Sequence, residues 1–208
     1  MESIIPRLIN FDALCQLEEE IAQIDDTQER EAREALLAQI MDKLMDYDAH
    51  VKAYLYKTDV QRLIAGGLGA EPTEKARLVL LWDSAVDRRV SAQQKRATPY
   101  YNDQYRWHLF SFGLLPALQQ QAAKEAFDRA EKRELYVFFE DGAAAYRLQN
   151  AQLLTAAEIE TLHENCPPEA LDAYFWEAQD GWVYVRPHEA DCGPYFFRWK
   201  DAEQNGSE

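Results

Sequence analysis

The hydrophobic pattern of this chain changes at Glu134. Before that residue, apolar side chains recur mostly at three- and four-residue steps, which predicts amphipathic helices. After it, short runs rich in aromatic and β-branched residues, such as Leu135 to Phe139, predict strands. Short connections join these runs, and they require antiparallel pairing because parallel strands need a long crossover. Helices segregated from an antiparallel sheet define an α+β fold.

The first helical segments are long. A helix over Phe11–Ile24 is predicted to end at Asp25-Asp26-Thr27, whose side chains offer capping oxygens to the next helix. That helix runs from about Gln28 to Ile64 and ends at the glycine-rich residues 66–69. Its three- and four-residue spacing places one set of apolar residues on a single face. The set is Leu36, Ile40, Leu44, Tyr47, Val51 and Tyr54.

Three further helices are expected before the change of pattern. Pro72 suits the first turn of a helix over about Thr73–Lys95. A buried helix rich in aromatic residues is predicted over Tyr105–Leu115, and a more polar one over Ala117–Arg133. The domain boundaries follow: a helical N-terminal extension at 1–70, an α+β domain at 71–200 and a disordered tail at 201–208.

The last third is predicted to hold about five strands with one short helix inserted. Asp141-Gly142 is a hairpin signal between the first two strands. Thr155 and Glu158 form a capping box for the inserted helix, which runs to His163. We expect the sheet to pack its aromatic face on the helix that contains Trp107. The expected strands are 135–139, 144–148, 172–178, 182–186 and 195–199.

The charge of the chain limits its partners. The 208 residues carry a net charge of −15, and the segment Asp12–Asp48 alone holds 12 acidic and three basic residues. Such a surface repels phosphate, which argues against nucleic acid and anionic membranes as ligands and favours a basic protein partner. Acidity can also serve solubility alone. No signal-peptide pattern and no apolar run of membrane-spanning length is present, so a cytoplasmic location is expected.

The three cysteines give no sign of a structural bridge. Cys15, Cys166 and Cys192 are odd in number and widely spaced, with no CxxC pair. We expect free thiols in a reducing compartment.

Two histidines are the main candidates for chemistry. His188 and Glu189 leave a predicted strand into a loop, where they can act as an acid–base pair or as metal ligands. His108 lies in the aromatic helix beside Trp107. One hypothesis brings His108, His188 and Glu189 together in a pocket that holds a divalent metal. The alternative is architectural, with the histidines bonded in the core and fixing the loop, and no cofactor is then required.

Other catalytic patterns are weaker or missing. Cys192 lies four residues from His188, so a thiol–imidazole pair is conceivable, but no third orienting group is evident. Residues 66–69 lack the Lys-Ser/Thr of a phosphate-binding loop, and no serine lies in a GxSxG elbow. The basic pairs Arg88-Arg89 and Lys95-Arg96 are interpreted as a solvated helix face that pairs with the acidic long helix.

The acidic first helices provide a candidate docking surface. A dense negative cluster would set the rate of association with a cationic protein, and a few aromatic anchors would set the affinity. A solvated helix face is the alternative. The candidate binding residues are Glu18, Glu19, Glu20, Asp25, Asp26, Tyr100, Tyr101, Trp107 and Tyr195.

Two segments resemble a family of uncharacterised bacterial proteins. Trp107-His108-Leu109-Phe110-Ser111 matches the family's Trp-His-x-Phe-Ser, and Gly193-Pro194-Tyr195-Phe196 matches its Gly-Pro-Tyr-Phe. The family's Thr-His-Glu is Pro187-His188-Glu189 in this chain. The resemblance covers roughly Leu78 to Phe197, so the first seventy or so residues look like an addition. Small, acidic α+β proteins of this kind are similar in general character to the immunity proteins encoded beside bacterial polymorphic toxins.

Three functional hypotheses follow. The first is an immunity-type inhibitor that binds a basic toxin domain through its acidic surface and does not turn over substrate. The second is an enzyme or metal-binding protein that uses His108, His188 and Glu189. The third is a phage-type decoy that mimics nucleic acid, although the mixed charges after Ala49 argue against it.

Overall fold

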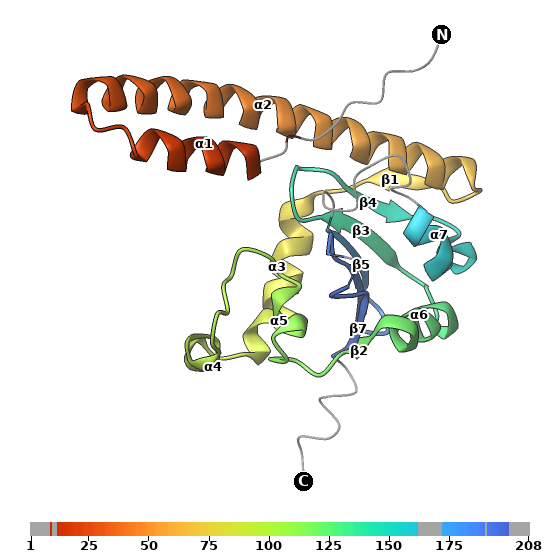
Figure 1. Cartoon of the computed structure of the whole chain (residues 1–208). Coiled ribbons are helices and arrows are strands. Elements are labelled where there is room, and N and C mark those ends of the chain that lie inside the picture. The colour runs from red at the N-terminus through yellow and green to blue at the C-terminus, as the bar shows by residue number, and fades with distance from the viewer. Residues whose placement is uncertain (1–8, 10–11, 162–171, 190, 200–208) are drawn as a thin grey trace. The chain divides into compact units, whose positions relative to one another are not determined.

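The computed structural model describes residues 9, 12–161, 172–189 and 191–199 (Figure 1). Within it the chain divides into two compact units, residues 1–55 and 56–208. The predicted tail at 201–208 lies outside the described residues, as do His163 and Cys166.

The first unit is a pair of helices. Helix α1 (Asp12–Ala22) leads through a short connection to α2 (Thr27–Ala65), which continues into the second unit. The connection ends in the predicted cap, because Asp26 Oδ1 accepts a hydrogen bond from the backbone N–H of Glu29 at 2.9 Å. Both helices therefore agree with the sequence prediction to within one or two residues at each end.

The apolar face predicted for α2 is largely exposed. Val51 is buried, and so are Leu37 and Leu55, which were not in the predicted set. Four members of the predicted set lie in solvent with 40–57% of their surface exposed: Leu36, Ile40, Tyr47 and Tyr54. Their spacing of four and then seven residues keeps them on one side of the helix, because α-helices have 3.6 residues per turn.

The second unit is built on one antiparallel sheet. Its strand order is β1-β4-β3-β5-β6-β7-β2, and every neighbouring pair is antiparallel, including the pairs β3–β4, β5–β6 and β6–β7 that short connections join. The strands are β1 (Ala70–Pro72), β2 (Leu118–Gln119), β3 (Leu135–Phe139), β4 (Ala145–Leu148), β5 (Ala173–Glu177), β6 (Trp182–Arg186) and β7 (Tyr195–Arg198).

The prediction of about five strands was too low, because the sheet has seven strands. The two additional strands are very short. Strand β2 comes from the segment predicted as the Ala117–Arg133 helix, and β1 lies between two predicted helices and includes Pro72, which was expected in a helix's first turn. Strand β1 runs along β4, with Pro72 opposite Tyr146, and β2 runs along β7, with Leu118 opposite Phe196. Pro72 therefore belongs to an edge strand, where its missing N–H is tolerated, and not to the first turn of a helix.

Helices cover both faces of this sheet (Figure 1). On one face lie α3 (Lys75–Ala85) and α5 (His108–Ser111), and on the other lie α6 (Gln120–Arg129) and α7 (Ala156–Thr161). Trp82 of α3 packs edge-on against Tyr174 at 5.3 Å between ring centroids. Phe127 of α6 packs on Tyr184 at 4.5 Å. Trp107 and Phe110 belong to the first of these cores, so the predicted packing of the sheet on the aromatic segment is confirmed.

The single helix predicted over Thr73–Lys95 is broken into three pieces. After α3 come a 3-10 turn, η1 (Asp87–Arg89), and α4 (Ala92–Ala97). The predicted helix is interrupted at Ser91, because the side chains of Ser91 and Gln94 form a reciprocal capping box that starts a new helix, α4. The predicted Tyr105–Leu115 helix shrinks to the four residues of α5.

The helix inserted between the strands forms as predicted. The Thr155 hydroxyl and backbone N–H both donate to Glu158 Oε2, and the Glu158 N–H donates back to Thr155 Oγ1 at 3.3 Å. A 3-10 turn, η2 (Ala151–Leu153), precedes it. In the part of the chain that the structure describes, no helix combines the length and the apolar character needed to cross a membrane.

Candidate functional site

The two candidate histidines are held by protein groups. His108 opens α5, is 7% exposed and places its Nδ1 3.0 Å from the backbone carbonyl oxygen of Asn102. His188 follows β6 and donates its backbone N–H to Asp172 Oδ1 at 2.7 Å. Its Nδ1 lies 3.0 Å from the same carboxylate oxygen. Both rings are therefore oriented by contacts that fix loops.

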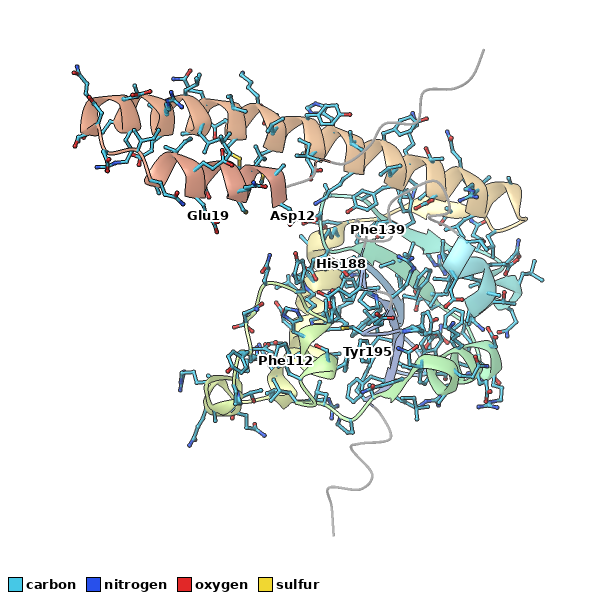
Figure 2. All side chains as sticks on the ribbon, viewed as in Figure 1. Asp12, Glu19, Phe112, Phe139, His188 and Tyr195 are labelled. Carbon is cyan, nitrogen blue, oxygen red and sulfur yellow. The ribbon has the colours of Figure 1, made fainter. Side chains whose placement is uncertain are left out.

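The histidines belong to one aromatic cluster. His108 and His188 both contact the ring of Trp107, at 4.4 and 5.8 Å between centroids. Both also contact Tyr105, at 5.3 and 5.0 Å. The structure thus brings the two histidines to the same cluster, as one hypothesis required, with aromatic rings as their shared neighbours. The ring of Phe112 also contacts His108, at 5.3 Å between centroids. Figure 2 labels His188 and Phe112 in the second unit.

The thiol of Cys192 is directed to a carboxylate. Its Sγ donates to Glu189 Oε2 at 3.0 Å, and this hydrogen bond, with burial, raises the pKa of Cys192 to about 11. Almost all of the group is therefore thiol at neutral pH, which disfavours nucleophilic chemistry. The other carboxylate oxygen of Glu189 lies 3.9 Å from Nε2 of His188.

A ligand set for a metal is not assembled in this region. Across residues 12–161, 172–189 and 191–199, no three side chains of His, Cys, Asp or Glu are grouped so that they could hold an ion. The hypothesis of a pocket formed by His108, His188 and Glu189 therefore gains no coordination geometry from the described residues. Asp172 was missed as the partner of His188 because it lies sixteen positions earlier in the sequence.

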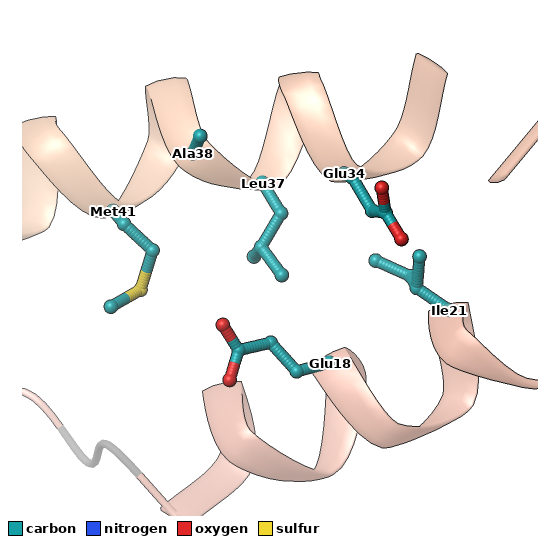
Figure 3. Close-up of a pocket in the computed structure, with 6 residues that line it drawn as sticks. All are labelled: Glu18, Ile21, Glu34, Leu37, Ala38 and Met41. Carbon is teal, nitrogen blue, oxygen red and sulfur yellow. The ribbon is translucent and has the colours of Figure 1, made fainter. Parts of the chain in front are cut away.

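The five acidic candidates of the first unit are exposed, but they differ in direction. Figure 3 shows Glu18 directed from α1 toward Leu37 and Met41 of α2, where these residues line a hollow of about 340 Å³. Glu19 projects from α1 on the side away from α2 (Figure 2). Asp26 is occupied as the cap of α2. Of the five acidic candidates, Glu19, Glu20 and Asp25 are therefore the ones that neither line the hollow nor cap α2.

The four predicted aromatic anchors fall into two groups. Trp107 and Tyr195 are each 2% exposed and belong to the core, so a partner docking on the present surface would not touch them. Tyr100 is 93% exposed and has a backbone φ of 61°, a left-handed conformation that is uncommon outside glycine. The neighbouring Tyr101 is partly buried and donates its hydroxyl proton to Asp103 at 2.7 Å.

A polar pocket lies beside Tyr101. It measures about 460 Å³, and segments distant in the sequence build it. Lys95 lies within it, 2.6 Å from Asp87 Oδ1 and 3.2 Å from Asp103 Oδ1. Asp87 and Asp103 therefore neutralise Lys95 locally. The sequence analysis had expected the acidic long helix to do so, and for Lys95 that expectation was wrong. The lining residues are Trp82, Asp83, Asp87, Lys95, Tyr101, Asp103, Gln104, Tyr105, Arg106, Leu109 and Glu140.

A second charged network closes the inner side of this pocket. Arg106 forms an ion pair with Glu140 and also donates its backbone N–H to the same carboxylate at 3.0 Å. The Tyr174 hydroxyl donates to Glu140 as well. Arg106 and Tyr174 each lie 34 residues from Glu140, so no local sequence motif could predict these contacts. The pocket was missed for the same reason.

The geometry defines an α+β domain whose antiparallel sheet is covered by helices on both faces. Most polar side chains in its clusters form hydrogen bonds or ion pairs with one another. The chain belongs to the DUF4275 family, described as a domain of unknown function, whose model matches residues 75–196. This span agrees closely with the resemblance noted over Leu78 to Phe197, and the family name carries no activity. No curated protein and no solved structure matches the chain.

Proposed function

We propose that this chain is a binding protein of the immunity type, which captures a basic toxin domain in the cytoplasm and neutralises it. The net charge of −15 supports this proposal because it attracts a cationic partner and accelerates the encounter. A protein of this kind needs no assembled catalytic centre, and the proposal therefore does not depend on the histidine cluster.

The observation that carries the proposal is the combination of charge and exposed apolar surface in the first unit. Glu19, Glu20 and Asp25 are exposed. In the same unit, α2 presents the four exposed apolar side chains Leu36, Ile40, Tyr47 and Tyr54 on one side. A row of large apolar side chains in solvent is typical of an interaction surface, where a few such anchors supply most of the affinity.

The test is co-expression with the product of the neighbouring gene. We expect the chain to rescue growth from a toxic product and to form a complex with it that survives purification. Raising the salt concentration should slow association by about tenfold, because screening removes electrostatic steering. If the neighbouring product forms no complex and a pull-down from the native host recovers no basic protein, the proposal is wrong.

A charge-reversal variant locates the surface. Glu19→Lys, Glu20→Lys and Asp25→Lys together change three charges by two units each, from −15 to −9. Glu18 and Asp26 are left intact because they line the hollow and cap α2. The matched control reverses three exposed acids of the second unit: Glu74, Glu125 and Glu131. We expect the first variant to lose neutralisation and the control to retain it, whereas equal losses would indicate a nonspecific charge effect.

A further inference from the structure

The pocket beside Tyr101 has the chemistry of a cation site. Four carboxylates line it, from Asp83, Asp87, Asp103 and Glu140, against the two cations Lys95 and Arg106. The lining therefore carries two more negative than positive charges. Concave surfaces of one sign focus the field and raise the local concentration of the opposite charge. Anionic ligands are disfavoured here for the same reason.

Lys95 shows how the pocket holds an ammonium group. Its Nζ lies between Asp87 and Asp103 and 6.0 Å from the ring centroid of Tyr101. Burial lowers the pKa of Lys95, but the hydrogen bonds to Asp87 and Asp103 outweigh burial and raise it overall. Carboxylates beside an aromatic ring form a common environment for protein-bound cations.

Two features leave room for a second cation. The pocket that Lys95 lines measures about 460 Å³, which falls in the range of small-ligand pockets. Asp83 is exposed on its lining, and with the described residues it forms no hydrogen bond or ion pair. Its carboxylate is therefore available to a group that enters from solvent.

The residue just before the pocket residue Tyr101 has an unusual conformation and exposure. Tyr100 directly precedes the pocket residue Tyr101 and combines 93% exposure with a φ of 61°. Left-handed backbone costs about 1–2 kcal/mol for a residue other than glycine. Outliers of this kind cluster at binding sites, and exposed tyrosines are enriched among interface anchors.

We propose that this pocket receives a cationic side chain, a lysine or arginine, of the basic partner, which lies against Tyr101 and Tyr105 and pairs with Asp83. This inference rests on the proposed function and adds the site and the chemistry of recognition. The pocket lies within residues 75–196, so it belongs to the part of the chain that the family shares.

The first experiment needs no partner. N-acetyl-lysine N-methylamide is titrated into the full chain, and the ring signals of Tyr101, Tyr105 and Trp82 are followed by NMR. We expect saturable shifts with a dissociation constant on the order of millimolar, as befits a small fragment. N-acetyl-norleucine N-methylamide has an uncharged side chain and should produce no such shifts. Absence of saturation with the lysine probe, or equal shifts from both probes, overturns the proposal.

Two variants test the role of charge. Lys95→Met removes the resident ammonium and should tighten binding of the lysine probe about tenfold, because Asp87 and Asp103 lose their cation. Lys124→Met is the matched control, since Lys124 pairs with Glu160 outside this pocket, and it should leave the affinity unchanged. If Lys95→Met does not fold, Asp83→Asn serves instead and should weaken the probe about threefold to fivefold. An unchanged affinity in the folded variant overturns the proposal.

The outcomes separate this inference from the proposed function. A chain that neutralises a toxin but binds neither lysine nor arginine methylamide in this pocket refutes the inference alone. A chain that binds these probes but no basic protein refutes the proposed function and leaves the cation site standing.

Discussion

The backbone N–H and the imidazole Nδ1 of His188 both contact the carboxylate of Asp172, at 2.7 and 3.0 Å. Asp172 immediately precedes β5, and His188 follows β6, so this pair joins the start of one strand to the loop after its neighbour. The carboxylate is buried, and the two residues pin the loop that leads to β7.

Asp172→Asn should therefore destabilise the second unit. The substitution removes a buried charge that accepts two hydrogen bonds, and we expect the free energy of unfolding to fall by about 1–3 kcal/mol. Urea denaturation measures the loss, with the exposed Asp25→Asn as the control that should change little. In the unchanged chain we expect the contact with Asp172 to slow exchange of the imidazole N–H of His188, so that its NMR signal is visible there and absent in the variant. A stability equal to that of the control would show that the pair does not hold the loop.

Glu177 gives a second stability prediction. Its side chain is 0% exposed, and its carboxylate accepts the backbone N–H groups of Glu134 and Asp180. Glu177→Gln places an amide donor against one of these donors, so the free energy of unfolding should fall by about 2 kcal/mol. Glu125→Gln, on the exposed side of α6, is the comparison. Equal midpoints of urea unfolding in the two variants would contradict this assignment.

The hairpin turn between β3 and β4 permits a test of close packing. Gly142 has a φ of +74°, and an added Cβ would lie 2.9 Å from Cε2 of Tyr56, whose ring stacks on Phe139. Gly113 has a similar φ of +69° with nothing within 4 Å. Gly113→Ala should cost about 1 kcal/mol for backbone strain alone. Gly142→Ala should cost about 1–2 kcal/mol more, because the ring must move. Thermal unfolding of both variants measures the difference. Equal decreases in the unfolding temperature would mean that the ring of Tyr56 moves aside at no cost in free energy.

The reactivity of Cys192 follows from its hydrogen bond. With a pKa of about 11, the thiol should react with iodoacetamide at pH 8 far more slowly than an ordinary cysteine, because only the thiolate attacks. Glu189→Gln removes the largest cause of the shift, so the pKa should fall and alkylation should accelerate about tenfold for each pKa unit lost. Peptide-resolved mass spectrometry measures the rate at Cys192, and Glu125→Gln should leave it unchanged. An equally slow reaction in Glu189→Gln would assign the protection to burial.

Local signals predicted local structure well. The cap at Asp26, the capping box at Thr155 and the Asp141-Gly142 turn all depend on residues within a few positions of each other, and the sequence displays them directly. The break at Ser91 shows the limit of hydrophobic spacing. The helical spacing of apolar residues continues past Ser91, so the prediction extended one helix through it and overlooked the Ser91–Gln94 capping box.

Long-range pairings could not be predicted. Asp172 with His188 and Arg106 with Glu140 depend on strand register, which a single sequence does not reveal. Strands β1 and β2 have three residues or fewer and exist only because β4 and β7 offer them unpaired edges. The inward row of α2 was misplaced by about one position, because α2 is amphipathic only weakly and Leu36 and Leu37 fit the pattern equally well.

Strand β1 lies at 70–72, before the segment that matches the family model, yet it covers the edge of β4 through pairs such as Glu71 with Arg147. A chain trimmed to begin at residue 75 would leave the outer N–H and C=O groups of β4 open to any extended peptide. Such an edge recruits strands from other molecules. The shortest form of this domain that stays monodisperse should therefore begin upstream of Ala70.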